Sequence, residues 1–329
     1  MPRSRNENPD LPPDLKMTWA LIRRRQDRRP QAVQSQFAIA GEITVALKNV
    51  IGIDHAVVMV KDLDKAAENY RQLGFTLSPR GTHSAHMGTG NYTIMFDPDY
   101  MELLGVLVAT EHNAPARAFV ERQGEGIERI AFTAIDSTEG AEEIRARGFT
   151  PVGPTDFERP VTLPDGTVSA AKFRTFMWPT AEAPGGVRIF ACQHKTRETV
   201  WIPELMKHAN AAKRISQVLI AAPEPAAEAA HLARLIDREP KAGADGAVTV
   251  PSGGDRADFV YLTLEQLGKR YRGVPLAGLS GRGGAALVLV SGDLAATEKA
   301  LGPAGVRSGA AIVVPPAKAN GTLIAFIAG

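Results

Sequence analysis

The chain has 329 residues and 44% apolar residues, enough for one large core or two ordinary cores. Its net charge of +2, with acids and bases interspersed, lacks the basic footprint of a nucleic-acid-binding protein, and no run reaches the roughly eighteen apolar residues of a membrane span. The single cysteine, Cys192, excludes an internal disulfide and is compatible with a reducing compartment, so the composition predicts a soluble, cytoplasmic protein.

The first 49 residues differ from the rest of the chain. Residues 1–13 are polar and rich in proline, and residues 23–29 form a basic run without apolar periodicity. The acids and prolines of this segment argue against a targeting helix. The pattern predicts a disordered N-terminal extension, and a start codon placed too far upstream would also explain it.

A strand followed by a helix is the first clear pattern. Residues 51–62 alternate around His55 as a half-buried strand does, and an aspartate at the end of this run can cap a helix over residues 63–73. Gly74 then stands where the end of a helix favours a left-handed residue. The lone histidine in an apolar strand indicates either a hydrogen-bonded core residue or a ligand.

A carboxylate lies on a second predicted strand, at residues 99–105. Tyr100, Glu102 and Leu104 share one face of this strand at period two, so Glu102 is expected to point inward and to need a partner. A solvated edge residue is the alternative interpretation. One imidazole and one carboxylate on two strands make half of a metal site.

The same strand and helix pattern recurs three more times. The first strands of these repeats lie at residues 126–136, 214–222 and 284–293, and their helices at residues 137–147, about 225–236 and 294–301. Asp165 and Gly166 mark a turn before an extended hairpin of residues 168–178 and 187–194 in the second repeat. The last repeat ends in a strand over residues 322–327.

Residues 51–105 resemble one βαβββ module of the vicinal-oxygen-chelate (VOC) superfamily, in particular of its glyoxalase-like members. The resemblance rests on runs in a specific order, at residues 53–58, 62–75, 81–83 with 88–92, and 100–104. It implies an α+β fold in which tandem βαβββ modules pair into incomplete β-barrels, with four modules in two pairs. The concave face of such a pair forms a pocket.

The repeats and the resemblance together divide the chain into four parts. We expect the N-terminal extension at 1–49, a first module pair at 50–195 with modules of about 50–110 and 125–195, a linker at 196–213, and a degenerate second pair at 214–329. In the second pair Gln217 occupies the histidine position and Ala325 the glutamate position, so the ligand set is missing there. His208 and Asn210 are candidates for ordering the linker.

In the superfamily the metal ligands come from the first and last strands of each paired module. The resemblance therefore implies that His55 and Glu102 are metal ligands, while Arg129 stands where the second histidine would be. Arginine cannot bind a metal ion, but it could pair with Glu102, or clamp a substrate carboxylate and take part in catalysis. Near the matching end of the second module, His194 is a candidate metal ligand or catalytic base, and Gln193 a weaker substrate contact.

The loop of residues 80–92 is a further feature of the resemblance. Its glycines permit close backbone approach, and His83, His86 and Asn91 supply substrate-binding donors near the expected pocket mouth. A third metal ligand from His83 or His86 is an alternative.

Two functions are compatible with these residues. The first is a metal-dependent lyase or isomerase, or a dioxygenase, acting on a small substrate that chelates a divalent Zn, Fe, Mn, Ni or Co ion through vicinal oxygens. The second is a metal-free module that sequesters a small molecule, as bleomycin-resistance proteins do. Either function predicts a small-molecule partner, no nucleic acid and no membrane, in a monomer or a homodimer.

Overall fold

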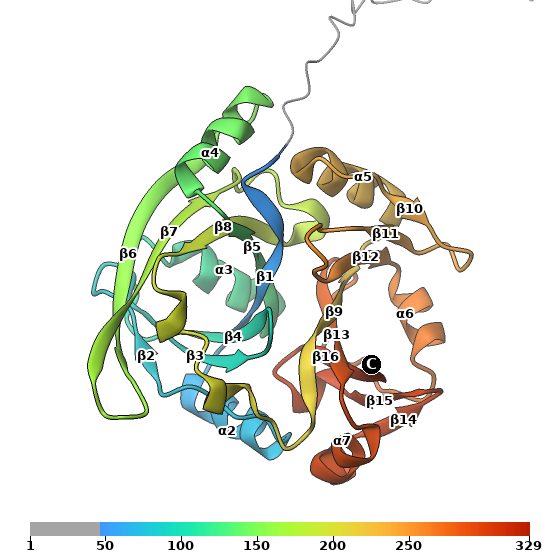
Figure 1. Cartoon of the computed structure of the whole chain (residues 1–329). Coiled ribbons are helices and arrows are strands. Elements are labelled where there is room, and N and C mark those ends of the chain that lie inside the picture. The colour runs from blue at the N-terminus through green and yellow to red at the C-terminus, as the bar shows by residue number, and fades with distance from the viewer. Residues whose placement is uncertain (1–46) are drawn as a thin grey trace, which may run out of the picture. The chain divides into compact units, whose positions relative to one another are not determined.

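Two eight-stranded sheets with helices packed on them form the part of the chain that this computed structural model describes, residues 47–329 (Figure 1). The predicted extension at 1–49 lies outside the described residues, apart from its last three positions. None of the described helices is long and apolar enough to cross a membrane.

The first sheet is built from residues 50–194. Its strands are β1 (Val50–Val60), β2 (Gly81–Thr82), β3 (Thr89–Met95), β4 (Tyr100–Val106), β5 (Gly126–Ala134), β6 (Val152–Thr162), β7 (Val168–Met177) and β8 (Arg188–His194). Its helices are α2 (Leu63–Gln72), α3 (Ala114–Gln123) and α4 (Ser137–Ala146). Three short 3-10 turns follow, η1 (Pro184–Gly186), η2 (Arg197–Thr199) and η3 (Pro203–Met206).

The second sheet is built from residues 212–328. Its strands are β9 (Ala212–Ala221), β10 (Lys241–Ala242), β11 (Val248–Val250), β12 (Asp258–Leu262), β13 (Gly283–Ser291), β14 (Val306–Ser308), β15 (Ala311–Val314) and β16 (Leu323–Ala328). Its helices are α5 (Pro225–Ile236), α6 (Leu264–Arg270) and α7 (Leu294–Leu301), with the 3-10 turns η4 (Gly302–Ala304) and η5 (Pro316–Lys318).

Both sheets have the same topology. Their strand orders are β2-β3-β4-β1-β5-β8-β7-β6 and β10-β11-β12-β9-β13-β16-β15-β14. Within each module the first strand pairs in parallel with the last, as β1 does with β4, and the first strands of two modules pair antiparallel, as β1 does with β5. The predicted α+β fold, with four βαβββ modules in two pairs, is confirmed.

The helix ends follow from local sequence. Asp62 caps α2 by accepting a hydrogen bond from the Lys65 amide, and Gly74 beyond its end has φ of 80°. Asp136 caps α4 in the same way, and Gly148 follows at φ of 86°. The predicted starts and ends of both helices are therefore confirmed, whereas the sequence analysis did not predict α3 and α6.

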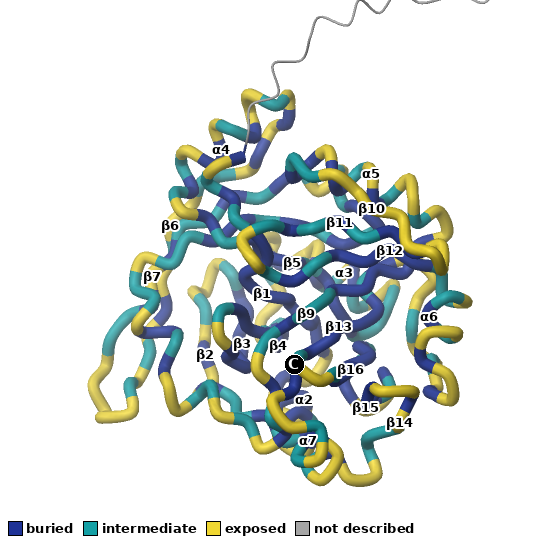
Figure 2. The backbone as a smooth tube through the Cα atoms, turned by 45° about the vertical axis from the view of Figure 1, so that its right-hand side comes forward, coloured by how far each residue is buried: buried dark blue, intermediate teal, exposed yellow. Residues whose placement is uncertain are grey.

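The largest apolar core joins the two sheets through their outer faces and the helices α2, α4 and α5. Phe132 of β5 stacks on Phe259 of β12 with ring centroids 5.7 Å apart, and Trp178 lies 5.8 Å from Phe132. Figure 2 shows the central strands β1, β5, β9 and β13 buried, while the turn between β6 and β7 is exposed. Aromatic side chains therefore pack the outer face of the first sheet against the outer face of the second.

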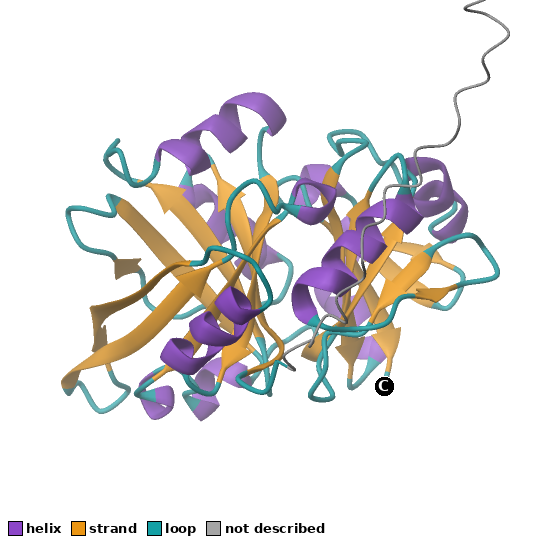
Figure 3. Ribbon diagram, turned by 90° about the horizontal axis from the view of Figure 1, so that it is seen from above, coloured by secondary structure: helices purple, strands orange, loops and turns teal. Residues whose placement is uncertain are grey.

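The first sheet curls until its edge strands β2 and β6 approach each other, which leaves a nearly closed barrel. Figure 3 shows the strands of the two sheets as two groups, each with helices beside it. The concave face of the first sheet carries its own apolar clusters, with Tyr100, Phe173 and Phe190 among their members. Side chains from β1, β3, β4, β6 and β8 therefore meet inside this sheet.

The segment between the sheets is held by the two residues proposed for it. His208 accepts a hydrogen bond at Nδ1 from the Thr76 amide at 3.0 Å, and its Nε2 lies 2.8 Å from the Met95 carbonyl oxygen. Asn210 donates from Nδ2 to the Leu73 carbonyl at 2.8 Å. Both side chains tie this segment to the first module, which is the alternative to a surface or packing role that the sequence left open.

Candidate functional site

A β-bulge places two neighbouring side chains of β1 on the concave face. In the pairing of β1 with β5, Ile53 lies opposite Phe132 and His55 opposite Ala131, so Asp54 is an extra residue between them. Strict alternation would send Asp54 and His55 to opposite faces, but the extra residue shifts that alternation. Asp54 is fully buried and His55 is 3% exposed.

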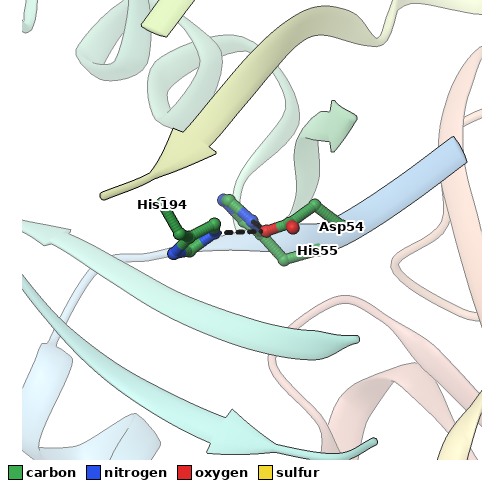
Figure 4. Close-up of side chains that lie close together, drawn as sticks. All are labelled: Asp54, His55 and His194. Atoms are coloured by element: carbon green, nitrogen blue, oxygen red, sulfur yellow. Dashed lines mark hydrogen bonds and ion pairs between the residues drawn. The ribbon is translucent and has the colours of Figure 1, made fainter. Parts of the chain in front are cut away.

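Asp54 lies between two histidines. Its Oδ1 is 2.7 Å from Nδ1 of His55 and 2.9 Å from Nε2 of His194, and its Oδ2 accepts a hydrogen bond from Thr133 at 2.8 Å (Figure 4). Burial alone would raise the pKa of Asp54, but the imidazoles of His194 and His55 lower it well below its usual range. Asp54 is therefore an ionised acceptor that fixes the orientation of both rings.

The second ring nitrogen of His55 points to a carboxylate. Its Nε2 lies 3.6 Å from Oε2 of Glu102 and 3.5 Å from the hydroxyl of Tyr100, whose ring stacks on the imidazole at 4.2 Å. The other oxygen of Glu102 accepts a hydrogen bond from Asn91 at 2.6 Å. His55, Glu102 and Asn91, all predicted site residues, are thus brought together.

His194 approaches the same group from β8. Its ring packs edge-on against Trp201 at 4.8 Å and Phe173 at 5.1 Å. Its Nδ1 is buried and has no hydrogen-bond partner among residues 47–329. Because Asp54 holds Nε2, the Nδ1 atom is left with a lone pair that can accept a proton.

Arg129 is occupied by its neighbour in sequence. Glu128 is a bulged residue of β5, and its buried carboxylate pairs with both Arg129 and Arg188. Burial alone would raise the pKa of Glu128, but the two guanidinium groups lower it. Arg129 therefore does not pair with Glu102, which was one of the roles considered for it.

The position of the second module that matches Glu102 would supply the fourth metal ligand of the first sheet. The strand register places an aromatic residue there. Val57 lies opposite Glu102 in the first module, and its counterpart Ala131 lies opposite Phe190 in the second. Phe190, which is not a metal ligand, thus matches Glu102. From the sequence we expected this position near Ala191, Gln193 and His194, and the pairing of β5 with β8 fixes it at Phe190, next to Ala191.

The remaining predicted residues lie in different places. His83 is partly buried, and burial lowers its pKa while the nearby Glu102 carboxylate opposes that shift. His86 is exposed, with its ring 5.0 Å from that of His112. Gln193 accepts a hydrogen bond from the Ser137 amide at the start of α4, so its side chain supports a helix and lies apart from the Asp54 group.

Asp54 is the residue that sequence reasoning missed. It stands beside His55, but a period-two pattern assigns the two to opposite faces, and the bulge depends on pairing with β5. Gly52, with φ of 120°, is the only nearby signal that the strand departs from regular geometry.

The second sheet carries the same bulges without the same chemistry. Ser216 and Ala285 are its extra residues, and the four positions that match the ligand positions hold Gln217, Val260, Ala286 and Ala325. Gln217 accepts a hydrogen bond from Arg270. An apolar cluster that includes three of these four residues fills this concave face.

Paired βαβββ modules, with polar side chains gathered on the concave face of one pair, define this chain as a protein of the VOC fold. The model of a family described as "Glyoxalase-like domain" matches residues 53–236, more than half of the chain. The chain belongs to this glyoxalase-like family. No curated protein matches it.

Two solved structures, at low sequence identity, share the fold. A hypothetical protein from Staphylococcus aureus is 14% identical with a TM-score of 0.60, over 84% of this chain and 99% of that one. A mutant of 4-hydroxymandelate synthase from Streptomyces coelicolor is 13% identical with a TM-score of 0.55, over 85% and 93%. A methylmalonyl-CoA epimerase from Mycobacterium tuberculosis is 22% identical with a TM-score of 0.35, over 45% and 89%.

Proposed function

We propose that the concave face of the first sheet binds a divalent cation through His55 and Glu102, and a small substrate that chelates the cation through neighbouring oxygens. The observation that carries this proposal is the position of His55 between two carboxylates. Asp54 holds its Nδ1, and its Nε2 faces Glu102. A metal-binding histidine commonly donates its other nitrogen to a carboxylate in this way.

The donor atoms fit a small divalent ion. Two ligand atoms at about 2.1 Å from one ion, at tetrahedral or octahedral angles, lie about 3.0–3.4 Å apart. Nε2 of His55 and Oε2 of Glu102 are 3.6 Å apart. A small rotation of the glutamate would bring both atoms to ligand distance, and the remaining positions would be open to substrate or water.

A second donor set shares His55. One ligand atom each from Asp54, His55 and His194 lies within 4.8 Å of the other two. Two histidines and one carboxylate also suit a divalent transition metal. We prefer the Glu102 set, because Asp54 and its two histidines already satisfy one another at 2.7 and 2.9 Å.

The residues around this pair suit proton transfer. When bound, the cation supplies a Lewis acid that stabilises negative charge on a substrate oxygen. His194 is held by Asp54 with Nδ1 free, so it can accept a proton from an adjacent carbon. Tyr100, Phe173 and Trp201 pack around these rings and limit the access of water. This arrangement supports a lyase or isomerase ahead of a dioxygenase.

Elemental analysis of the purified protein tests the proposal. The wild-type protein should carry about one equivalent of a divalent transition metal, and His55→Ala should carry almost none. His86→Ala is the matched control, because His86 is exposed and contacts neither Asp54 nor Glu102. Equal metal content in the wild type and in His55→Ala would contradict the proposal.

Metal-free sequestration of a small molecule is the second candidate function. It is favoured by Arg129 and Phe190, which occupy the other two ligand positions and cannot bind a metal ion. Under this function the purified protein would carry no metal, and substitution of His55 would leave metal content unchanged at zero. The same elemental analysis therefore separates the two candidates.

A further inference from the structure

Arg159 of β6 is a buried cation without a partner. Its side chain is 7% exposed, and it forms no hydrogen bond or ion pair with any group among residues 47–329. Burial lowers the pKa of Arg159, against the attraction of Tyr100 and Glu102. A guanidinium group carries five donors and remains protonated in proteins. None of the Arg159 nitrogens is among the fully buried unpaired atoms of residues 47–329, so these donors are accessible from the adjoining cavity.

Arg159 points into a cavity on the concave side of the first sheet. Phe157 and Val161, two residues away on either side of Arg159, belong to the concave apolar cluster, which places Arg159 on the same face. The cavity has a volume of about 220 Å³, and its lining includes Arg159 together with Ser78, Thr82 and Thr93. Hydroxyl groups and one unpaired guanidinium thus face a single cavity that opens to solvent.

This cavity adjoins the proposed metal site. Thr93, which lines it, lies opposite Glu102 in the pairing of β3 with β4. Gly81 lies between Asn91 and Arg159. If Gly81 carried a Cβ atom, that atom would collide with the Asn91 side chain and lie 3.4 Å from Cδ of Arg159. Asn91 in turn donates to Glu102 at 2.6 Å. One layer of side chains therefore separates Arg159 from the carboxylate of the site.

The charge count in the cavity favours a singly charged anion. Arg80 also lines the space, but its guanidinium is already paired with Asp64 at 2.8 Å. Among the residues that line the cavity, Arg159 therefore supplies the positive charge that has no ion-pair partner. A carboxylate matches this charge and the fork of the guanidinium, whereas a phosphate dianion would keep an excess negative charge in a buried space.

We propose that Arg159 binds the carboxylate of a monocarboxylate substrate, whose other end reaches His55 and Glu102. The end of the substrate that reaches His55 and Glu102 rests on the proposed function. The contact between the carboxylate and Arg159 requires no metal. The cavity is also large enough for a small ring, because an engineered apolar cavity of about 150 Å³ accommodates benzene. A ring or a branched chain of that size fits the space of about 220 Å³.

Calorimetric titration of the full chain, stripped of metal with a chelator, tests the contact without catalysis. Benzoate is the probe, benzamide is its neutral analogue of the same shape, and inorganic phosphate is the dianionic comparison. The wild type should bind benzoate about tenfold or more tightly than benzamide, as expected for a hydrogen-bonded charge pair. Phosphate should bind more weakly than benzoate.

Three variants locate the effect. Arg159→Met should lose the preference for benzoate, and Arg159→Lys should keep part of it, because lysine preserves the charge if the methionine variant fails to fold. Arg174→Met is the matched control on the same hairpin, since Arg174 pairs with Asp156 and lies outside the cavity lining. It should bind benzoate as the wild type does.

Equal binding of benzoate and benzamide by the wild type would overturn the proposal. So would an unchanged preference for benzoate in Arg159→Met, or tighter binding of phosphate than of benzoate. Because the protein is metal-free in these titrations, such results would leave the assignment of metal to His55 and Glu102 untouched. Loss of metal binding in the wild type would conversely leave the Arg159 contact standing.

Discussion

Replacement of Asp54 by asparagine keeps the shape of the side chain and removes its charge. In the wild type this fully buried carboxylate accepts from His55 at 2.7 Å, from His194 at 2.9 Å and from Thr133 at 2.8 Å. An asparagine can keep all three contacts, with its oxygen on the two histidines and its NH₂ group donating to the Thr133 hydroxyl. What it removes is the negative charge that strengthens the two histidine hydrogen bonds.

The size of the effect follows from these contacts. A hydrogen bond to a charged group contributes about 1.5–3 kcal/mol, against about 0.5–1.5 kcal/mol for one between neutral groups. The two histidine contacts lose this difference, so we expect Asp54→Asn to lower the free energy of unfolding by about 2–3 kcal/mol at pH 7. Thr133→Val, which removes a single hydrogen bond to the same carboxylate, should cost about 1–2 kcal/mol.

Urea denaturation of the wild type and both variants measures these differences. The pKa of Asp54 is lower in the folded protein than the ordinary value of 3.8. Its contribution to stability is therefore present above pH 3.8 and is lost as the pH falls through the folded-state pKa. The difference between wild type and Asp54→Asn should therefore shrink in acid, as the pH falls through the folded-state pKa of Asp54. Equal stability of Asp54→Asn and Thr133→Val would refute the reasoning.

Three further predictions concern affinity, packing and pH. Asp54→Asn should weaken metal binding about 10–100-fold without abolishing it. Competition with a fluorescent chelator measures this change, and a complete loss of binding would instead indicate that Asp54 is a metal ligand. Gly284→Ala should destabilise the fold by about 1–3 kcal/mol in thermal melts, because its Cβ would collide with Ile127; unchanged stability would refute that close approach. Burial raises the pKa of Asp99 to about 7, so the folded state holds a proton that the unfolded state releases near pH 3.8. Its contribution to stability should fall as the pH rises from about 4 to 7, and Asp99→Asn should remove that decline in urea titrations at several pH values.

Much of the fold could be predicted because its signals are local. The alternation around His55, the aspartates that cap α2 and α4, and the glycines after both helices lie within one turn or strand of the elements they define. Recurrence of this pattern then indicated four modules. The helix α3, by contrast, begins at Ala114, and Asn113 before it makes no side-chain cap hydrogen bond, so its start carries no strong sequence signal.

The site was only partly predictable, because it depends on pairing between distant strands. His55 and Glu102 were identified from their own strands, and the structure brings them together. Asp54 faces them only because the register of β1 with β5 contains an extra residue. Arg159 has no local signal at all, since its isolation depends on the curling of β6 towards β2.

The position of a bound ion tests the central claim most directly. Crystals of the full chain grown with Mn²⁺ or Zn²⁺ would give anomalous difference density at the ion. We predict one strong peak between Nε2 of His55 and Oε2 of Glu102, with Asp54 still bound to Nδ1. A peak between Asp54 and His194, or the absence of any peak at His55, would contradict the account.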